Sequence, residues 1–153
     1  MTPRLNYVAT APKLIQAMVN LEKAVASSGL EHSLIELVKT RASQINGCGY
    51  CLDMHTRDAR KAGETEARLY LLDAWREVPH YTPRERAALA WTEALTLIAS
   101  THAPDADYEG LKPHFSDEEI VKLSLLIVTI NGWNRLAIGF RNVPPVVATP
   151  AVA

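Results

Sequence analysis

The chain has 153 residues, of which 48 % are hydrophobic, and its formal net charge is -1. This length and composition suit one folded domain with a substantial core, expected over residues 1–153, and they exclude a disordered chain. A net charge near zero without a Lys/Arg-rich run gives no general attraction to nucleic acid or to an anionic membrane, so we expect neither as a partner.

The cysteine content and the N-terminal sequence together suggest a cellular compartment. The first residues lack the apolar segment of a signal peptide, and we expect no stretch to be long and apolar enough to span a bilayer. The expected location is therefore the cytoplasm. In that compartment a pair of cysteines is more often redox-active or metal-binding than a structural crosslink.

The first half of the chain reads as helices separated by short breaks. After an irregular lead-in over 3–12, apolar residues at three- and four-residue steps predict helices over 13–27 and 33–45. Asn46-Gly47 ends the second of these helices. A third helix is expected from Cys48 or Cys51 to residue 62, and a short fourth over 65–75.

The second half continues the helical pattern. Thr82 and Pro83 open a predicted fifth helix over 83–100, and 105–114 has room for one or two turns. A long helix over 117–140, capped by Ser116, has almost no polar face, which predicts burial all round, in the core or between subunits. The tail over 141–153 is Pro-rich and expected to be extended. No segment alternates with period two, so the predicted fold class is all-α with six or seven helices.

The chain's only two cysteines, Cys48 and Cys51, lie at the start of the third predicted helix. The positive end of a helix favours a thiolate, and His55, four residues after Cys51, shares its helix face and can accept the thiol proton. Glu36 lies on the preceding helix. If the two helices pack antiparallel, its carboxylate reaches the same pocket and can orient His55 or relay protons.

Simpler interpretations of these residues also exist. Ser33 with Glu36 matches a capping box, in which the carboxylate only bonds the start of its own helix. The cysteine pair with His55 could supply three zinc ligands, but a structural zinc site needs four, and the chain's remaining histidines are scattered. The cysteines could also simply fill space in the core. We predict no metal and no cofactor.

Several polar or large aromatic residues elsewhere have structural explanations. Asn131, Trp133, Asn134 and Arg135 lie within the long apolar helix, where polar groups need partners. We expect them to contact another subunit or the helix that carries Glu36. Two further tryptophans, Trp75 and Trp91, are expected in the core.

The segment Glu36-x(11)-Cys48-x-x-Cys51-x-x-x-His55 resembles the core motif of the AhpD-like alkylhydroperoxidases, which are grouped with the carboxymuconolactone decarboxylases. The stretches LVKTRASQINGCGYC, TPRERAALAWTEALT and FSDEEIVKLSLLIVTINGWNRLAI agree, so the resemblance covers residues 4–140. It implies an all-helical fold that assembles into trimers or hexamers. It also implies a thiol-dependent peroxidase or disulfide reductase that takes a small hydroperoxide and is reduced by an external dithiol or redox protein.

By that motif Glu36, Cys48, Cys51 and His55 carry over as active-site residues, with Cys48 and Cys51 as a redox-active disulfide. One residue departs from the best-studied AhpD proteins, which have a histidine where this chain has Tyr50. A tyrosine hydroxyl, with an ordinary pKa of about 10, can join a proton relay but is a poor base near pH 7. Carboxymuconolactone decarboxylases proper do not use this cysteine pair, which argues against lactone decarboxylation.

Two further assignments follow. Its closeness to His55 favours Cys51 as the thiol that attacks a peroxide, and Cys48, at the helix start, as the one that meets the reductant. The alternative function is a non-enzymatic helical oligomer whose cysteines sense redox state or hold a metal.

Overall fold

The computed structural model describes residues 2–145, and every regular element in that range is helical. The elements are α1 (Tyr7–Thr10), α2 (Pro12–Ala26), α3 (His32–Asn46), α4 (Gly49–Lys61), α5 (Glu66–Tyr70), the 3₁₀ helix η1 (Leu72–Ala74), α6 (Pro83–Thr96), α7 (Ile98–Thr101), α8 (Asp105–Glu109) and α9 (Asp117–Phe140). The predicted all-α class is therefore confirmed. Residues 146–153 of the predicted extended tail lie outside the described residues.

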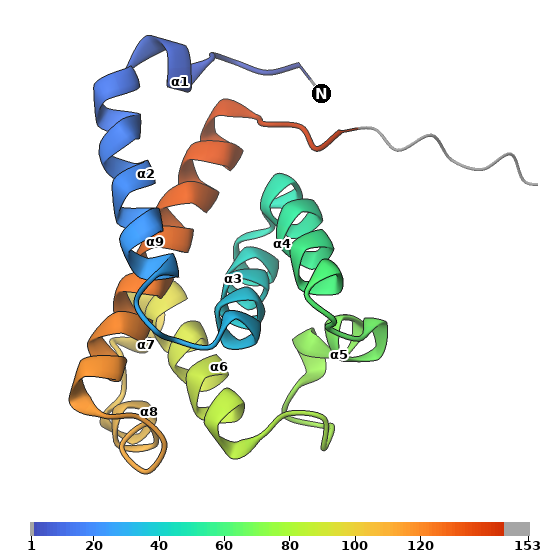
Figure 1. Cartoon of the computed structure of the whole chain (residues 1–153), viewed down its shortest axis with the longest axis vertical. Coiled ribbons are helices and arrows are strands. Elements are labelled where there is room, and N and C mark those ends of the chain that lie inside the picture. The colour runs from blue at the N-terminus through green and yellow to red at the C-terminus, as the bar shows by residue number, and fades with distance from the viewer. Residues whose placement is uncertain (1, 146–153) are drawn as a thin grey trace, which may run out of the picture.

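Helix α3 is the centre of the fold, with α4 on one side and α6 and α9 on the other (Figure 1). All residues from Leu34 to Thr40 are buried, because neighbouring helices cover nearly every face of this helix. Its apolar side chains meet those of α6 and α9 in the main core, which includes Leu34, Ile35, Val38, Trp91, Leu123, Leu126 and Ile127. A second cluster packs Leu37 against Leu72, Trp75, Tyr81 and Leu89. Both tryptophans expected in the core are there.

Two helix starts follow the expected chemistry. Thr82 and Glu85 form a reciprocal capping box at the start of α6, and Ser116 and Glu119 form another at the start of α9. The third expected box is absent. Helix α3 begins at His32 after Glu31, with no side-chain cap, and the Glu36 carboxylate turns to another helix. The capping interpretation of Ser33 and Glu36 was therefore wrong.

Helix boundaries differ from the predictions in three places. The lead-in over 3–12 contains the single turn α1, capped by the Asn6 side chain. The predicted fourth helix is an α-helix only as far as Tyr70, and the separate 3₁₀ helix η1 follows it from Leu72. The fifth is interrupted at Leu97, whose φ of -99° and ψ of 27° separate α6 from α7. A single turn or a local break carries little periodicity, so the sequence pattern does not show it.

Helix α9 is less buried than its composition predicts. Val121, Leu125 and Val128 are 59 %, 43 % and 58 % exposed, although the opposite side of the helix packs into the core. The expectation that no stretch could span a bilayer also needs correction, since α9 is long and apolar enough by length and composition alone. Core helices pass the same test, and α9 packs along α2, α3 and α6. The absence of a membrane partner and the cytoplasmic location stay predictions.

Candidate active site

The turn between α3 and α4 places both cysteines. Gly47 follows the last residue of α3 with a φ of 69°, a left-handed conformation that glycine adopts without strain. The Cys48 N–H donates to the Ser43 carbonyl at 3.0 Å and the Gly47 N–H to the Gln44 carbonyl at 3.1 Å, the pair of bonds that defines a Schellman motif. Cys48 is then the N-cap of α4, and its sulfur accepts the Cys51 N–H at 3.4 Å.

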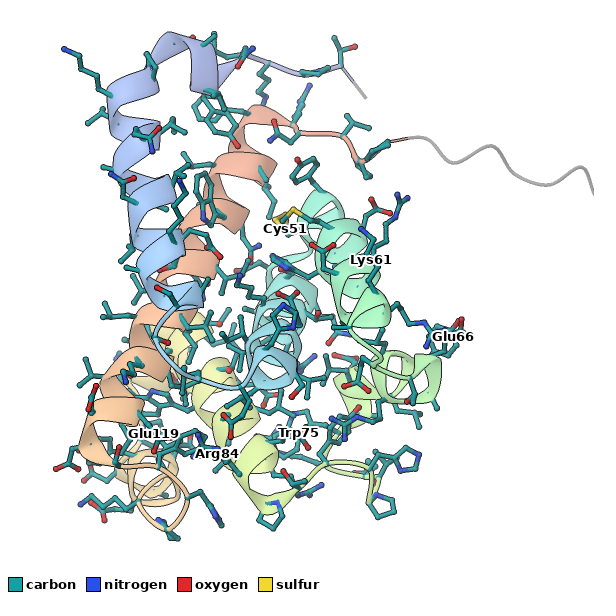
Figure 2. The ribbon with its side chains drawn as sticks, viewed as in Figure 1. Cys51, Lys61, Glu66, Trp75, Arg84 and Glu119 are labelled. Carbon is teal, nitrogen blue, oxygen red and sulfur yellow. A yellow bond between two sulfur atoms is a disulfide. The ribbon has the colours of Figure 1, made fainter. Side chains whose placement is uncertain are left out.

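Cys48 and Cys51 form a disulfide, with their Cα atoms 5.4 Å apart. The two residues are 1 % and 2 % exposed and pack against Ala137 of α9, with Tyr50 beside them. Figure 2 shows the sulfur–sulfur bond beside the Cys51 label, at the end of α4 that faces α9. The cysteine pair thus lies at the start of α4 and packs against α9 at one end of the fold.

A buried amide network holds the end of α3 against α9. The Asn134 side chain is fully buried, donates to the Ser43 hydroxyl at 3.1 Å and accepts from the Asn46 amide at 2.9 Å. Asn131 accepts from the same Asn46 amide at 2.9 Å and donates to Thr96. The prediction that the polar residues of α9 contact the helix bearing Glu36 is confirmed for Asn131 and Asn134. Trp133 instead bonds to Glu22 of α2, and the Arg135 guanidinium donates to Asn131 of its own helix. The bonds of Asn131 and Asn134 to α3 fix the turn that carries the cysteines.

Glu36 and His55 meet between α3 and α4. The Glu36 Oε2 atom lies 2.9 Å from Nδ1 of His55, and both residues are 6 % exposed. A carboxylate at Nδ1 stabilises the tautomer that carries its proton there, so Nε2 is left as the ring's proton acceptor. The antiparallel packing that the sequence permitted is therefore present.

Two charged residues near this pair were missed from the sequence. The buried Lys39 ammonium forms an ion pair with Glu22 of α2 and lies 4.0 Å from Oε1 of Glu36. The Trp133 indole N–H donates to Glu22 at 3.2 Å. The spacing of Lys39, three residues after Glu36 on one helix face, was a usable signal. Glu22 lies on a separate helix, and nothing in the local sequence links it to the motif.

A cavity of about 370 Å³ adjoins these groups and is called the His55 cavity here. It is lined by Tyr7, Glu22, Glu36, Lys39, Tyr50, Cys51, Met54, His55, Asp58, Trp133 and Ala137. Cys51 and His55 share it, but Cys48 does not line it. A cysteine, a histidine and a carboxylate that contacts the histidine thus meet at one small cavity, and these are the residue types that thiol catalysis uses.

The metal interpretation gains no ligand set from the structure. Within residues 2–145 no group of three His, Cys, Asp or Glu side chains is placed to hold a metal ion. The other four histidines lie away from the cysteine pair in sequence, and His32, His80 and His102 are exposed.

This all-helical fold carries a Cys-x-x-Cys disulfide beside a carboxylate–histidine pair, and comparisons with known proteins identify its family. The model of the carboxymuconolactone decarboxylase family matches residues 12–94. Protein YdfG of Bacillus subtilis is 45 % identical over 142 residues, which are 93 % of this chain and 97 % of YdfG. The chain belongs to the carboxymuconolactone decarboxylase family, among its AhpD-like members.

Solved structures extend the comparison. Protein ATU0492 of Agrobacterium tumefaciens, of unknown function and provisionally assigned to antioxidant defence as AhpD, has a TM-score of 0.93 and 51 % identity, over 95 % of this chain and 100 % of that one. A peroxidase-related protein from Silicibacter has a TM-score of 0.79 and 25 % identity, over 90 % and 73 %. The debrominase Bmp8, with a TM-score of 0.78 and 19 % identity over 91 % and 75 %, shares the fold.

Proposed function

We propose that this protein is a thiol-dependent peroxidase that reduces a small hydroperoxide with the Cys48–Cys51 pair. One observation supports the proposal above the others: Cys51 lines a cavity together with His55, whose Nδ1 is held 2.9 Å from the Glu36 carboxylate. The antioxidant-defence assignment of ATU0492 and the peroxidase-related description of the Silicibacter protein agree with it.

In the proposed reaction His55 accepts the Cys51 thiol proton at Nε2, and the Glu36 carboxylate holds the Nδ1 proton and balances the imidazolium charge. The Cys51 thiolate attacks the terminal peroxide oxygen. A sulfur–oxygen bond forms, the oxygen–oxygen bond breaks, and His55 returns its proton to the departing alkoxide. Cys51 is then a sulfenic acid and the product is an alcohol.

The second half of the reaction closes the disulfide. The Cys48 sulfur attacks the Cys51 sulfur, the sulfur–sulfur bond forms, and the hydroxyl group leaves as water with the Cys48 proton. The product is the disulfide present in the structure. An external thiol reductant (a dithiol, a redox protein or two small thiols) reduces it by thiol–disulfide exchange and itself becomes a disulfide. Tyr50 lines the same cavity and is proposed as an additional proton relay.

The cavity also limits the substrate. A volume of about 370 Å³ lies at the small end of ligand sites. Tyr7, Met54 and Trp133 provide apolar walls, and Glu22 and Asp58 add negative charge. We therefore expect a small, uncharged organic hydroperoxide rather than an anionic one, because a carboxylate on the substrate would meet the like charge of the cavity's own carboxylates.

The test measures hydroperoxide consumption by the full chain with dithiothreitol as the electron donor. Wild type should consume cumene hydroperoxide, and Cys51→Ser should lose the activity. Cys48→Ser should still react once, leaving a sulfenic acid that dimedone traps. If wild type and Cys51→Ser consume peroxide at the same rate, the peroxidase proposal is wrong.

The alternative functions predict different results for the same protein. A disulfide reductase would reduce a disulfide substrate with the same cysteine pair but would be slow with peroxide. A non-enzymatic redox sensor would form the disulfide without turnover. Stoichiometric zinc with no titratable thiols would instead support the metal-binding alternative.

Assembly into a homo-oligomer, trimeric or hexameric by family resemblance, is proposed from the exposed side of α9. Val121, Leu125 and Val128 follow one another at steps of four and three residues and form an apolar stripe on that face. Sedimentation at micromolar concentration should show a species larger than the 16.9 kDa chain. A monomer at all concentrations would contradict the proposed assembly.

A further inference from the structure

The disulfide lies between two cavities with opposite charge. The His55 cavity on one side is lined by Cys51. A second cavity of about 560 Å³, called the Cys48 cavity here, is lined by Cys48 and not by Cys51. Its lining residues are Arg4, Gly47, Cys48, Gly49, Tyr50, Ala137, Ile138, Gly139, Arg141, Asn142, Val143 and Pro144. Tyr50 and Ala137 line both cavities, so they form the wall between them.

The charges of the two cavities differ in sign. The His55 cavity carries three carboxylates, Glu22, Glu36 and Asp58, and Lys39 is the only lysine or arginine that lines it within residues 2–145. The Cys48 cavity carries Arg4 and Arg141 and, among the described residues, no acidic side chain. Neither guanidinium pairs with a carboxylate within residues 2–145. Both positive charges are therefore available to a ligand.

Both arginines are held in place by the end of α9. The Arg4 backbone N–H donates to the Phe140 carbonyl at 3.0 Å, and its guanidinium donates to the Gly139 carbonyl at 3.1 Å. Arg141 ends α9 with a φ of 57°, a left-handed conformation in which glycine would be less strained. The backbone there does not require an arginine, so its side chain needs another explanation.

We propose that the Cys48 cavity is the reductant site, and that it takes a small thiol that carries a carboxylate. The proposal rests on the proposed redox function of the cysteine pair. Cys48 lines this cavity and is only 1 % exposed, which favours a slender thiol over the convex surface of a protein as its reductant. The two arginines bind the carboxylate and attract the incoming thiolate.

Attack from this side also suits the chemistry of the leaving group. The reductant thiolate attacks the Cys48 sulfur, a mixed disulfide forms, and the Cys48–Cys51 bond breaks. The electron pair goes to Cys51, whose thiolate lies at the cavity that contains His55. A second thiol then attacks the reductant sulfur of the mixed disulfide and releases Cys48 as a thiolate. The balance is one protein disulfide and two small thiols converted to two protein thiols and one small disulfide.

The experiment follows disulfide reduction alone. The protein is oxidised with diamide and then reduced anaerobically with 3-mercaptopropionate or, as the neutral match, 2-mercaptoethanol. Free protein thiols are alkylated at intervals and counted by mass spectrometry, and each rate is divided by the thiolate concentration. The rate ratio of the anionic to the neutral thiol isolates the contribution of the carboxylate.

Wild type should prefer 3-mercaptopropionate, and Arg4→Gln/Arg141→Gln should lower the ratio by about three- to tenfold, as expected for two partly solvated charges. Arg141→Gly alone should lower it less, and because glycine suits this backbone the variant keeps the fold. The control Arg57→Gln removes an exposed arginine outside both cavities and should leave the ratio unchanged.

A wild-type ratio at or below one would overturn the proposal, as would a ratio that the double variant does not change or that Arg57→Gln lowers equally. Since no peroxide is present, these outcomes do not depend on peroxidase activity. Failure of diamide to form the disulfide would instead count against the proposed function itself.

Discussion

Two carboxylates, the buried Glu36 and the half-buried Glu93, meet very different partners. The Glu36 side chain is 7 % exposed and contacts His55 and Lys39 beside the His55 cavity. The Glu93 side chain is 17 % exposed and receives the Trp75 indole N–H at 2.8 Å. It also pairs with Arg41 at 2.9 Å and with Arg76.

The difference lies in what each set of partners can do with a proton. Burial alone would raise the pKa of Glu93, but the hydrogen bonds from Trp75 and Arg76 and the charge of Arg41 outweigh it and hold the pKa below its ordinary value. Arginine does not release its proton in a protein, so this cluster can only hold structure. The histidine that Glu36 contacts has a second ring nitrogen that can accept or give a proton, which is the role proposed for the Glu36–His55 pair.

The largest expected effect is that of His55→Ala on thiol reactivity. Without the base, the pKa of the Cys51 thiol should rise toward about 8.5, and the rate of attack on peroxide should fall by about 10²–10⁴. The measurement is the pH dependence of alkylation of the reduced protein by iodoacetamide. His80→Ala, at an exposed histidine, is the matched control. An unchanged thiol pKa in His55→Ala would remove His55 from the mechanism.

The second effect concerns the structural cluster. Glu93→Gln removes the negative charge that pairs with both Arg41 and Arg76. It should lower the free energy of unfolding by about 1–3 kcal/mol. Urea denaturation should show a lower midpoint with an unchanged slope. The thiol pKa and peroxide rate should match wild type. A large loss of thiol reactivity in this folded variant would show that Glu93, like Glu36, influences the Cys51 thiol.

Glu36→Gln should have a smaller effect on the thiol than His55→Ala, because Glu36 acts through His55. We expect the pKa of the Cys51 thiol to rise by about one unit, which leaves about tenfold less thiolate at neutral pH. The double variant His55→Ala/Glu36→Gln should lose little more than His55→Ala alone. Additive losses in the double variant would mean that Glu36 acts on the thiol independently of His55.

The sequence carried most of the fold and the core of the candidate site. Helical periodicity located every long helix, because an apolar face repeats over several turns. It did not reveal the break at Leu97 or the single turn over Tyr7–Thr10, which involve too few residues. It overestimated the burial of α9, since composition cannot show that Val121, Leu125 and Val128 face away from the core.

The site divides in the same way. Cys51 and His55 lie four residues apart on one helix, so their closeness follows from helix geometry. Glu36 could be assigned to a cap or to the pocket, and only the packing of α3 on α4 decided between them. Glu22, Arg4 and Arg141 come from segments far from the motif, and tertiary packing alone brings them to the two cavities.

The lowered pKa of Glu93 should make the free energy of unfolding depend on pH. Its pKa in the folded protein lies below the ordinary value of 4.5, so near that pH the unfolded chain binds more protons. The stabilisation is complete above about pH 4.5 and is lost as the pH falls through the folded-state pKa. Glu31 also has a lowered pKa, through its bond from Arg84, and contributes in the same direction.

Urea midpoints between pH 6 and pH 3 should therefore fall in wild type and fall less steeply in Glu93→Gln. Glu31 and Arg84 are unchanged in both proteins, so the difference between the two plots of urea midpoint against pH reports on Glu93. If the urea midpoint changes equally with pH in the two proteins, Glu93 has the same pKa in the folded and unfolded chains.

The smallest expected effect is that of Ser33→Ala, which tests whether Glu36 serves its own helix start as well as His55. Ser33 is exposed and makes no cap at the start of α3, so its loss should change the free energy of unfolding by less than about 0.5 kcal/mol. Thr82→Ala is the matched comparison. The Thr82 hydroxyl accepts the Glu85 N–H at 3.2 Å in a complete capping box, and its loss should cost about 1 kcal/mol. If Ser33→Ala costs as much as Thr82→Ala and also slows alkylation of Cys51, then Glu36 is divided between a cap and His55. If Ser33→Ala changes neither the free energy of unfolding nor the alkylation rate, Glu36 interacts with His55 and not with its own helix start. Glu93 likewise interacts with its arginines.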